Sequence, residues 1–185
     1  MLTVPVGVKP AAGWPTVVGA HGLGGRNLPV PGDVDSYCLE NAQVLAAAGI
    51  ACLGIDATSH GLRGSSFSFL NVANMAEVRD NFRQMTFDLM QLTRAAPAID
   101  VDGDGQGDLD PDLGYLGNSL GAIMGAHFLT FARHVSHFVL NVPGGGLSNI
   151  LVSDDIRDRL GLLLVAETGI TFDSTDYYGS FPLFR

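Results

Sequence analysis

The chain has 185 residues, 46% of them apolar, and a mean hydropathy of +0.25. This is enough for one domain with a hydrophobic core, and it excludes an intrinsically disordered chain. The formal net charge of -9 argues against nucleic acid and anionic membrane as partners, because both bind clustered Lys and Arg. No apolar stretch approaches the roughly 20 residues that span a bilayer, and no signal-peptide pattern is visible, so no transmembrane segment is expected.

The first third of the chain predicts two buried strands around one helix. Thr16–Ala20 is rich in β-branched residues and stops at a glycine-rich turn, which is typical of a strand that runs into a loop. Asp35 or Ser36 is expected to cap a helix that ends at Gly49. Residues 50–55 then predict the second strand.

Cys38 and Cys52 are the only cysteines, too few for a disulfide framework or a four-ligand zinc site. Cys52 lies in the second predicted strand and Cys38 in the predicted helix. Two buried thiols are therefore favoured over one bridge, which stays open as the alternative.

The clearest periodicity follows, because apolar residues recur at three- and four-residue steps over residues 75–92 and predict a long amphipathic helix, ended by Pro97. Residues 113–116 and 135–142 predict two more strands, and residues 121–132 a helix of small residues between them. Strands alternating with helices indicate the α/β class, with a mostly parallel sheet and helices on both faces.

The pentapeptide Gly117-Asn118-Ser119-Leu120-Gly121 joins the third predicted strand to the next helix. It has the G-x-S-x-G spacing of a nucleophile elbow, a strained turn that lifts a serine hydroxyl above the end of a sheet. Glycines are needed on either side, because side chains there would clash with the neighbouring strand and helix. Ser119 is thus the candidate nucleophile, against the alternative of an incidental serine in a glycine-rich turn.

Acyl transfer also needs N–H donors for an oxyanion, and a helix that begins at the serine directs N–H groups toward developing negative charge. One donor is the backbone N–H of Leu120. The other is expected from the His21-Gly22-Leu23-Gly24 turn, through the N–H of Leu23, because this H-G-x-G stretch follows the first strand. His21 is expected to brace the loop and not to act as the catalytic base.

Residues 100–108 form an acidic loop with the spacing of a calcium site. Carboxylates stand at positions 1, 3, 5 and 9 and a glycine at position 6. Position 12 is Pro111, so Asp110, Asp112 or a water would replace the usual bidentate Glu. The pattern favours Ca²⁺ at roughly 0.1 to 1 mM affinity over a solvated acidic turn. The expected ligands are Asp100, Asp102, Asp104, Gln106 and Asp108.

Between Thr16 and Gly146 the chain resembles the α/β-hydrolase superfamily, on the turn at His21, the elbow at Ser119 and the His60-Gly61 turn after the second strand. The Trp14-Pro15 segment, the acidic loop before the elbow and residues 141–146 resemble large extracellular bacterial lipases, the group that contains virulence-factor surface lipases. The resemblance implies that the remaining histidines are structural: His60, His127, His134 and His137.

The chain departs from this family in its triad. Members place an acid and then a histidine on loops after later strands, whereas here no histidine follows His137. The only acid candidates are Asp154, Asp155, Asp173 and Asp176. The resemblance also implies strands before Thr16, and none is evident. The expectation is an N-terminal part of a catalytic domain that is inactive alone, with residues 1–146 as the hydrolase core, the calcium loop inserted at 100–112, and residues 147–185 as the start of a cap or lid.

Two functions are compatible with these features. The first is a serine carboxylic-ester hydrolase, a lipase or esterase acting on a lipid or small-molecule ester, with no organic cofactor. The alternative is a non-catalytic, calcium-stabilised binding or adhesion module on a hydrolase fold. The calcium loop and the resemblance both imply a secreted, cell-surface or periplasmic bacterial protein. The oligomeric state is left open.

Overall fold

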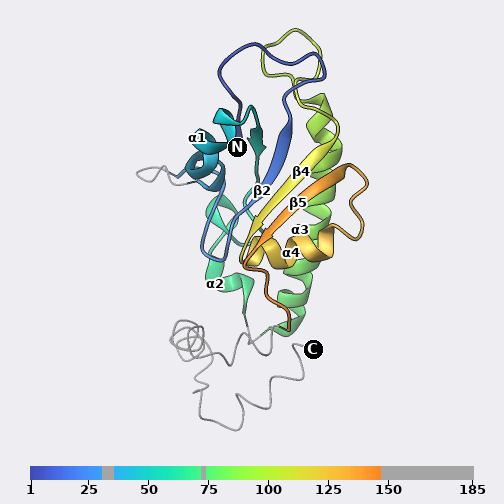
Figure 1. The fold of residues 1–185 in the computed structure, drawn as a ribbon. Helices are drawn as coiled ribbons and strands as arrows, with labels where there is room; N and C mark the ends of the chain where they lie inside the picture. Colours follow the sequence, from blue (N-terminus) through green and yellow to red (C-terminus); the bar gives the residue numbers. More distant parts are fainter. Residues whose placement is uncertain (31–35, 72–73, 147–185) are drawn as a thin grey trace.

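The computed structural model describes residues 1–30, 36–71 and 74–146 (Figure 1). Within these ranges one sheet of five strands has the order β1-β3-β2-β4-β5. Only β1 runs antiparallel, against β3, so the prediction of a mostly parallel sheet is confirmed. The strands are β1 (Leu2–Thr3), β2 (Thr16–Ala20), β3 (Ala51–Leu53), β4 (Leu113–Asn118) and β5 (Val135–Asn141).

Helices cover both faces of the sheet (Figure 1). Successive residues of a strand point to opposite faces, and in β2 a Cβ atom on Gly19 would meet Tyr37 and Cys38 of the first helix. The side chains of its neighbours Val18 and Ala20 point to the opposite face of the sheet, where they belong to the hydrophobic core. The α-helices are α1 (Tyr37–Ala47), α2 (Ser66–Phe69), α3 (Met75–Ala95) and α4 (Leu120–Phe128), and the 3₁₀ helices are η1 (Gly61–Arg63) and η2 (Ala96–Ala98).

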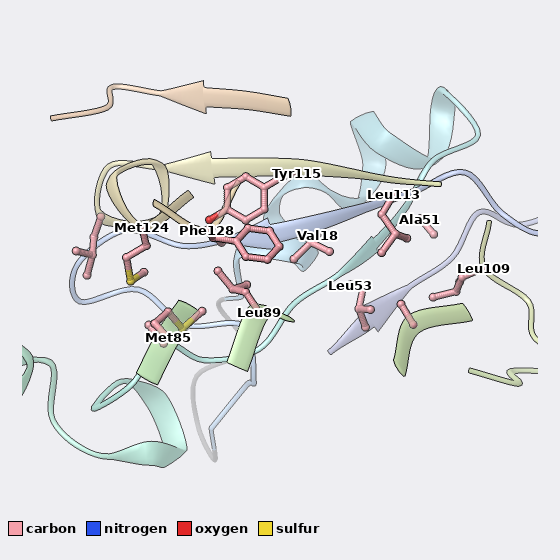
Figure 2. Close-up of a cluster of buried hydrophobic side chains, with 14 of the residues drawn as sticks. Val18, Ala51, Leu53, Met85, Leu89, Leu109, Leu113, Tyr115, Met124 and Phe128 are labelled. Atoms are coloured by element: carbon pink, nitrogen blue, oxygen red, sulfur yellow. The ribbon is translucent and has the colours of Figure 1, made fainter. Parts of the chain in front are cut away.

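The hydrophobic core lies between the sheet and the pair α3 and α4 (Figure 2). The apolar stripe of α3 supplies Met85 and Leu89, which are buried as its periodicity predicts. Tyr115 of β4 packs against Phe128 of α4, with ring centroids 5.6 Å apart. This packing fixes β4 and α4 relative to each other, and therefore the turn at Ser119 that joins them.

Several boundaries differ from the prediction. β3 ends at Leu53 and α4 at Phe128, both earlier than expected, and β1 precedes Thr16 where no strand was evident. Ser36 occupies the N-cap position of α1, but its hydroxyl oxygen accepts no hydrogen bond from the N–H groups of the helix; the hydroxyl instead donates to the carbonyl of Asn27 (2.6 Å). Ser36 is thus the cap residue by position, as expected for one of the two candidates, whereas the capping hydrogen bond is absent, because the hydroxyl is turned toward the loop carbonyl.

The preference for two free thiols is also wrong, because Cys38 of α1 and Cys52 of β3 form a disulfide. Both side chains are fully buried. The bridge passes over Gly19, where a Cβ atom would lie 2.7 Å from the sulfur of Cys52 and 3.0 Å from that of Cys38. A residue without a side chain in β2 thus makes room for the bridge between its neighbours.

Among the described strands, β5 forms one edge of the sheet. It presents Phe138 and Val139 to solvent, 60% and 58% exposed respectively.

None of the described helices combines the length and apolar character needed to cross a bilayer. The predicted cap and its four acid candidates fall in residues 147–185, which lie outside the described residues. Asp35, the other candidate cap of the first helix, also lies outside them.

Candidate active site

The candidate nucleophile lies where β4 passes into α4 at the carboxyl end of the sheet (Figure 1). Ser119 has φ 51° and ψ -113°, a conformation that residues with a side chain rarely adopt. Its backbone N–H donates to the carbonyl of Asn141 in β5 (3.0 Å), and its carbonyl accepts from the N–H groups of Ala122 and Ile123. These bonds hold the strained turn between the strand and the helix.

The hydroxyl of Ser119 is half-buried and makes no hydrogen bond within the described part of the chain. Gly22 lies against the side chain of Ser119, since a Cβ atom on Gly22 would be 3.3 Å from the Cβ of Ser119. The structure thus brings the elbow at residue 119 and the turn at residues 21–25 together, as the sequence predicts.

Two glycines flank the serine because there is no room for a side chain. A Cβ atom on Gly121 would lie 2.2 Å from the carbonyl oxygen of Ala20, and one on Gly117 would lie 2.6 Å from the carbonyl oxygen of Gly121. Both distances are shorter than any normal contact. The steric reason given for the two glycines is therefore confirmed, whereas Gly24 serves the turn through its positive φ of 79°.

The two expected oxyanion donors both lie at this junction. Leu120 is the first residue of α4, and its N–H has no acceptor among the described residues. The N–H of Leu23 likewise has no acceptor among the described residues. Two residues later, the N–H of Gly25 donates to the carbonyl of Gly22 (3.0 Å) and closes the turn. Two unpaired N–H groups therefore flank the elbow, and either could donate to a bound oxygen atom.

The turn is fastened to the loop that follows β3. His21 is 2% exposed; its Nε2 accepts from the N–H of Ala57 (2.9 Å) and its Nδ1 lies 2.8 Å from the carbonyl oxygen of Gly22. Burial lowers the pKa of the ring, an effect that the hydrogen bond to Gly22 partly opposes. These contacts agree with the bracing role expected of His21.

A second tie joins the same loops, and the sequence interpretation did not anticipate its partners. Asp56 is buried and accepts from the N–H groups of Asn27 (2.6 Å) and Leu28 (3.0 Å), while Asn27 donates to the carbonyls of Gly19 and Ile55, both at 2.9 Å. Only the position of Asp56 directly after a buried strand could have signalled this role. Asn27 carried no recognisable signal, because its partners come together only in the folded chain.

None of the five histidines contacts the hydroxyl of Ser119. His60 is fully buried, its Nδ1 lies 2.8 Å from the carbonyl oxygen of Thr58, and burial lowers its pKa. His127 lies about 12 Å along α4 from Ser119 and contacts Thr86 (2.9 Å). The last two, His134 and His137, lie beside the first residues of β4, about 15 to 20 Å along the strand from the elbow.

A pocket of about 200 Å³ opens beside the turn. It is lined by Leu23 and Arg26 of the turn, by Tyr37 and Glu40 of α1, and by Asn118, next to the candidate nucleophile. The amide of Asn118 accepts from that of Asn141 (2.7 Å), which fixes this wall of the pocket against β5.

The acidic loop lies apart from this site, before β4. Carboxylate oxygens of Asp100, Asp102 and Asp108 lie within 4.8 Å of one another, whereas the carboxylate of the expected ligand Asp104 is not in this group. Asp108 is buried; it accepts from the N–H groups of Val101 and Asp102 and from the ammonium of Lys9. The hydrogen bond from Lys9 is the main reason why the pKa of Asp108 is lowered.

Lys9 is a feature that the sequence interpretation did not anticipate. Besides Asp108, its ammonium lies 3.2 Å from Asp102 and 3.8 Å from Asp104. The pKa of Lys9 is raised, first by its hydrogen bond to Asp108 and then by that to Asp102. A lysine more than ninety residues away in the sequence thus supplies the positive charge at this loop.

No protein-family model matches the chain, and no curated protein does. Solved structures do match. An acetyl xylan esterase 1 from Thermoanaerobacterium sp. JW/SL YS485 superposes with a TM-score of 0.54 and 14% identity, over 95% of this chain and 55% of the esterase. A cold-adapted esterase from an Arctic intertidal metagenomic library gives a TM-score of 0.51 and 17% identity, over 91% of this chain and 68% of that one.

An acylaminoacyl peptidase from Pyrococcus horikoshii also matches, with a TM-score of 0.53 and 17% identity, over 99% of this chain but only 26% of the peptidase. The chain therefore spans between about a quarter and two thirds of the structures it resembles. At such low identity the likeness concerns the fold. The strand order, the helices on both faces and these superpositions together show that the described chain has the α/β-hydrolase fold.

Proposed function

We propose that this protein is a serine carboxylic-ester hydrolase of the lipase or esterase type, with Ser119 as the nucleophile. The observation that carries the proposal is the backbone of Ser119: a positive φ at a strand-to-helix turn, with the hydroxyl half-buried and without a hydrogen bond in the described chain. A strained residue persists only where the surroundings enforce it, and here that strain serves to present a hydroxyl. The esterases that share the fold support the same reading.

In this reaction Ser119 Oγ would attack the acyl carbonyl as its proton passes to a general base, and the carbonyl oxygen would become negatively charged. The N–H groups of Leu120 and Leu23 would donate to that oxygen, at the positive end of the α4 dipole. The alcohol then leaves with a proton from a general acid, and water hydrolyses the acyl-serine. The substrate would be a small-molecule or lipid ester, with its smaller part in the pocket beside Asn118.

We propose that the general base, a histidine, and its acid partner lie outside residues 1–146. The five described histidines make no contact with Ser119 Oγ, and an unassisted serine hydroxyl is a weak nucleophile. The 185-residue chain alone is therefore expected to turn over esters slowly or not at all. A longer natural product of the same reading frame, with a further acid and a late histidine, is expected to be active.

The test compares the 185-residue chain with the full-length natural product, using a fluorophosphonate probe and short p-nitrophenyl esters. The full-length product should be labelled at Ser119 and hydrolyse the esters, and Ser119→Ala should abolish both. Ser136→Ala, on the edge strand β5, is the matched control and should behave as the wild type. A stop codon directly after Arg185, or a full-length product that the probe does not label, would favour the non-catalytic binding or adhesion module. Labelling that persists in the Ser119→Ala variant would instead place the nucleophile at another residue.

We also propose that the acidic loop binds Ca²⁺ and stabilises the domain. The supporting observation is that oxygens of Asp100, Asp102 and Asp108 lie within 4.8 Å of one another. Because the Lys9 ammonium contacts Asp102 and Asp108, it would compete with the ion. Asp104 and Gln106 would complete the ligand set after a small rearrangement of the loop.

Thermal unfolding in millimolar Ca²⁺, in Mg²⁺ and in chelator tests the calcium proposal. We expect Ca²⁺ to raise Tm and Mg²⁺ to raise it less. Lys9→Met should enlarge the calcium effect, since it removes the competing charge, and Asp108→Asn should reduce it. Asp80→Asn, at an exposed ion pair on α3, is the control. An unchanged Tm across millimolar Ca²⁺ in both the wild type and Lys9→Met would refute the site.

We also propose a secreted, cell-surface or periplasmic location, on the basis of the disulfide and the proposed calcium site. The disulfide between Cys38 and Cys52 supports it, because such bonds persist in oxidising compartments. Calcium at millimolar affinity is likewise an extracellular arrangement. Fractionation of the natural source cells with an antibody against the chain would decide the matter, and recovery only in the cytoplasm would contradict it.

A further inference from the structure

The hydrogen bonds of His21 define which of its ring nitrogens carries the proton. A carbonyl oxygen only accepts, so the contact with Gly22 (2.8 Å) requires a hydrogen on Nδ1. A backbone N–H only donates, so the bond from Ala57 (2.9 Å) requires a lone pair on Nε2. Only the neutral ring with its hydrogen on Nδ1 satisfies both partners at once.

These two bonds act on the segment that carries Leu23. Gly22 lies against Ser119, and Gly25 returns its N–H to the carbonyl of Gly22, so residues 22–25 form one closed turn. The far side of this segment is held through Asn27 by Asp56. The near side is held by His21, whose ring joins the turn to the loop after β3.

A proton on Nε2 would break this arrangement, because it would place an N–H group opposite the N–H of Ala57. The ionisable groups near His21 are His60, whose ring centroid is 5.1 Å away, and Asp56. The pocket wall adds Arg26, Tyr37 and Glu40. Burial outweighs Asp56 and lowers the pKa of His21, so the neutral ring is the form present near pH 7.

We propose that His21, through its Nδ1–H tautomer, is a positioning residue that sets the Leu23 N–H toward the acyl oxygen on Ser119. This inference rests on the function proposed above. His21 touches neither the substrate nor the hydroxyl of Ser119; it acts through the turn. A displacement of about 1 Å in a group that stabilises the transition state costs about 100-fold in rate, so the position of this turn matters for kcat.

Two substitutions separate the two hydrogen bonds. His21→Asn places an amide near Nδ1 and keeps a donor for Gly22, but it offers no acceptor to Ala57. His21→Gln reaches the place of Nε2 and keeps that acceptor. In the full-length active protein, His21→Asn should lower kcat by about 10- to 100-fold with less than about a threefold change in KM. His21→Gln should recover most of that loss, and His127→Asn, on the outer part of α4, should match the wild type.

The pH profile supplies a readout that a purely structural role would not move. In the wild type, kcat should fall in acid as His21 gains a proton, in addition to the fall caused by the catalytic base. In His21→Gln this extra acid limb should be absent. Unchanged kcat in a folded His21→Asn variant, or an acid limb in His21→Gln identical to that of the wild type, would overturn the inference, while reactivity of Ser119 would leave the proposed function intact.

Nitrogen-15 NMR of the imidazole rings tests the geometry without any activity. At pH 7 to 8 His21 should show the neutral form with its hydrogen on Nδ1. The Nε2–H tautomer would overturn the inference. If the wild-type protein neither reacts with fluorophosphonate nor hydrolyses esters, the proposed function fails and the positioning role falls with it, whatever the tautomer. The two failures are therefore distinguishable.

Discussion

Of the two glycines that flank Ser119, Gly121 leaves the less room for a side chain. It lies in the first turn of α4, where alanine has the better helix propensity by about 1 kcal/mol. A Cβ atom there would nevertheless lie 2.2 Å from the carbonyl oxygen of Ala20, a backbone atom that cannot move without disturbing β2. The clash and the propensity therefore act in opposite directions, and a measurement shows which dominates.

We expect Gly121→Ala to destabilise the protein by about 1 to 3 kcal/mol, the usual cost of overpacking, and to lower Tm by roughly 3 to 10 °C. Gly145→Ala is the matched control, because no atom of the described residues lies within 4 Å of a Cβ atom there and its φ is not positive. Thermal unfolding followed by circular dichroism measures both. Equal Tm values for the two variants would mean that α4 and β2 are not as close as described.

At the scale of elements, the disulfide ties α1 to β3. The two cysteines are 14 residues apart, and closing a loop of that size stabilises a protein by about 3 kcal/mol. α1 covers its face of the sheet with few buried side chains, Cys38 being the one buried residue within it. The bridge therefore contributes a large part of what holds this helix in place.

The double variant Cys38→Ala/Cys52→Ala should lower Tm by roughly 6 to 12 °C. Dithiothreitol should lower Tm of the wild type by a similar amount and leave the double variant unchanged. A thiol titration of the unfolded, unreduced protein should detect no free cysteine. Two reactive thiols in that titration would restore the arrangement that the sequence favoured.

At the scale of the whole molecule, self-association is the main expectation, because β5 forms an edge of the sheet among the described strands. An edge strand leaves a row of unpaired N–H and C=O groups, and here it also exposes Phe138 and Val139. A second strand from another copy of the chain could pair with this edge. The 185-residue chain is therefore expected to self-associate through β5.

Size-exclusion chromatography at several concentrations should show this association. Val139→Lys should shift the elution toward the monomer, because a charge on an edge strand opposes pairing. Phe87→Lys, at an equally exposed phenylalanine on α3, should leave the elution unchanged. A monomeric wild type at all concentrations would contradict the expectation.

The sequence by itself determined the alternation of strands and helices and the position of the elbow. Those features depend on local patterns: β-branched runs, the apolar period of α3, and glycines at Gly117 and Gly121 where neighbouring backbones leave no room. β2 and the start of α3 have the bounds that such patterns predict. The likeness in fold that the elbow and the His21 turn suggested is also confirmed, while their chemical roles stay predictions.

Only the tertiary structure decided which distant residues meet. The bridge between Cys38 and Cys52, the contact of Lys9 with Asp108 and the tie between Asn27 and Asp56 join residues that no local pattern relates. The same holds for β1, since two residues become a strand only through pairing with β3. A local pattern reports what a residue does to its own backbone, whereas partners across the sheet are fixed by packing, and packing exists only once the chain has folded.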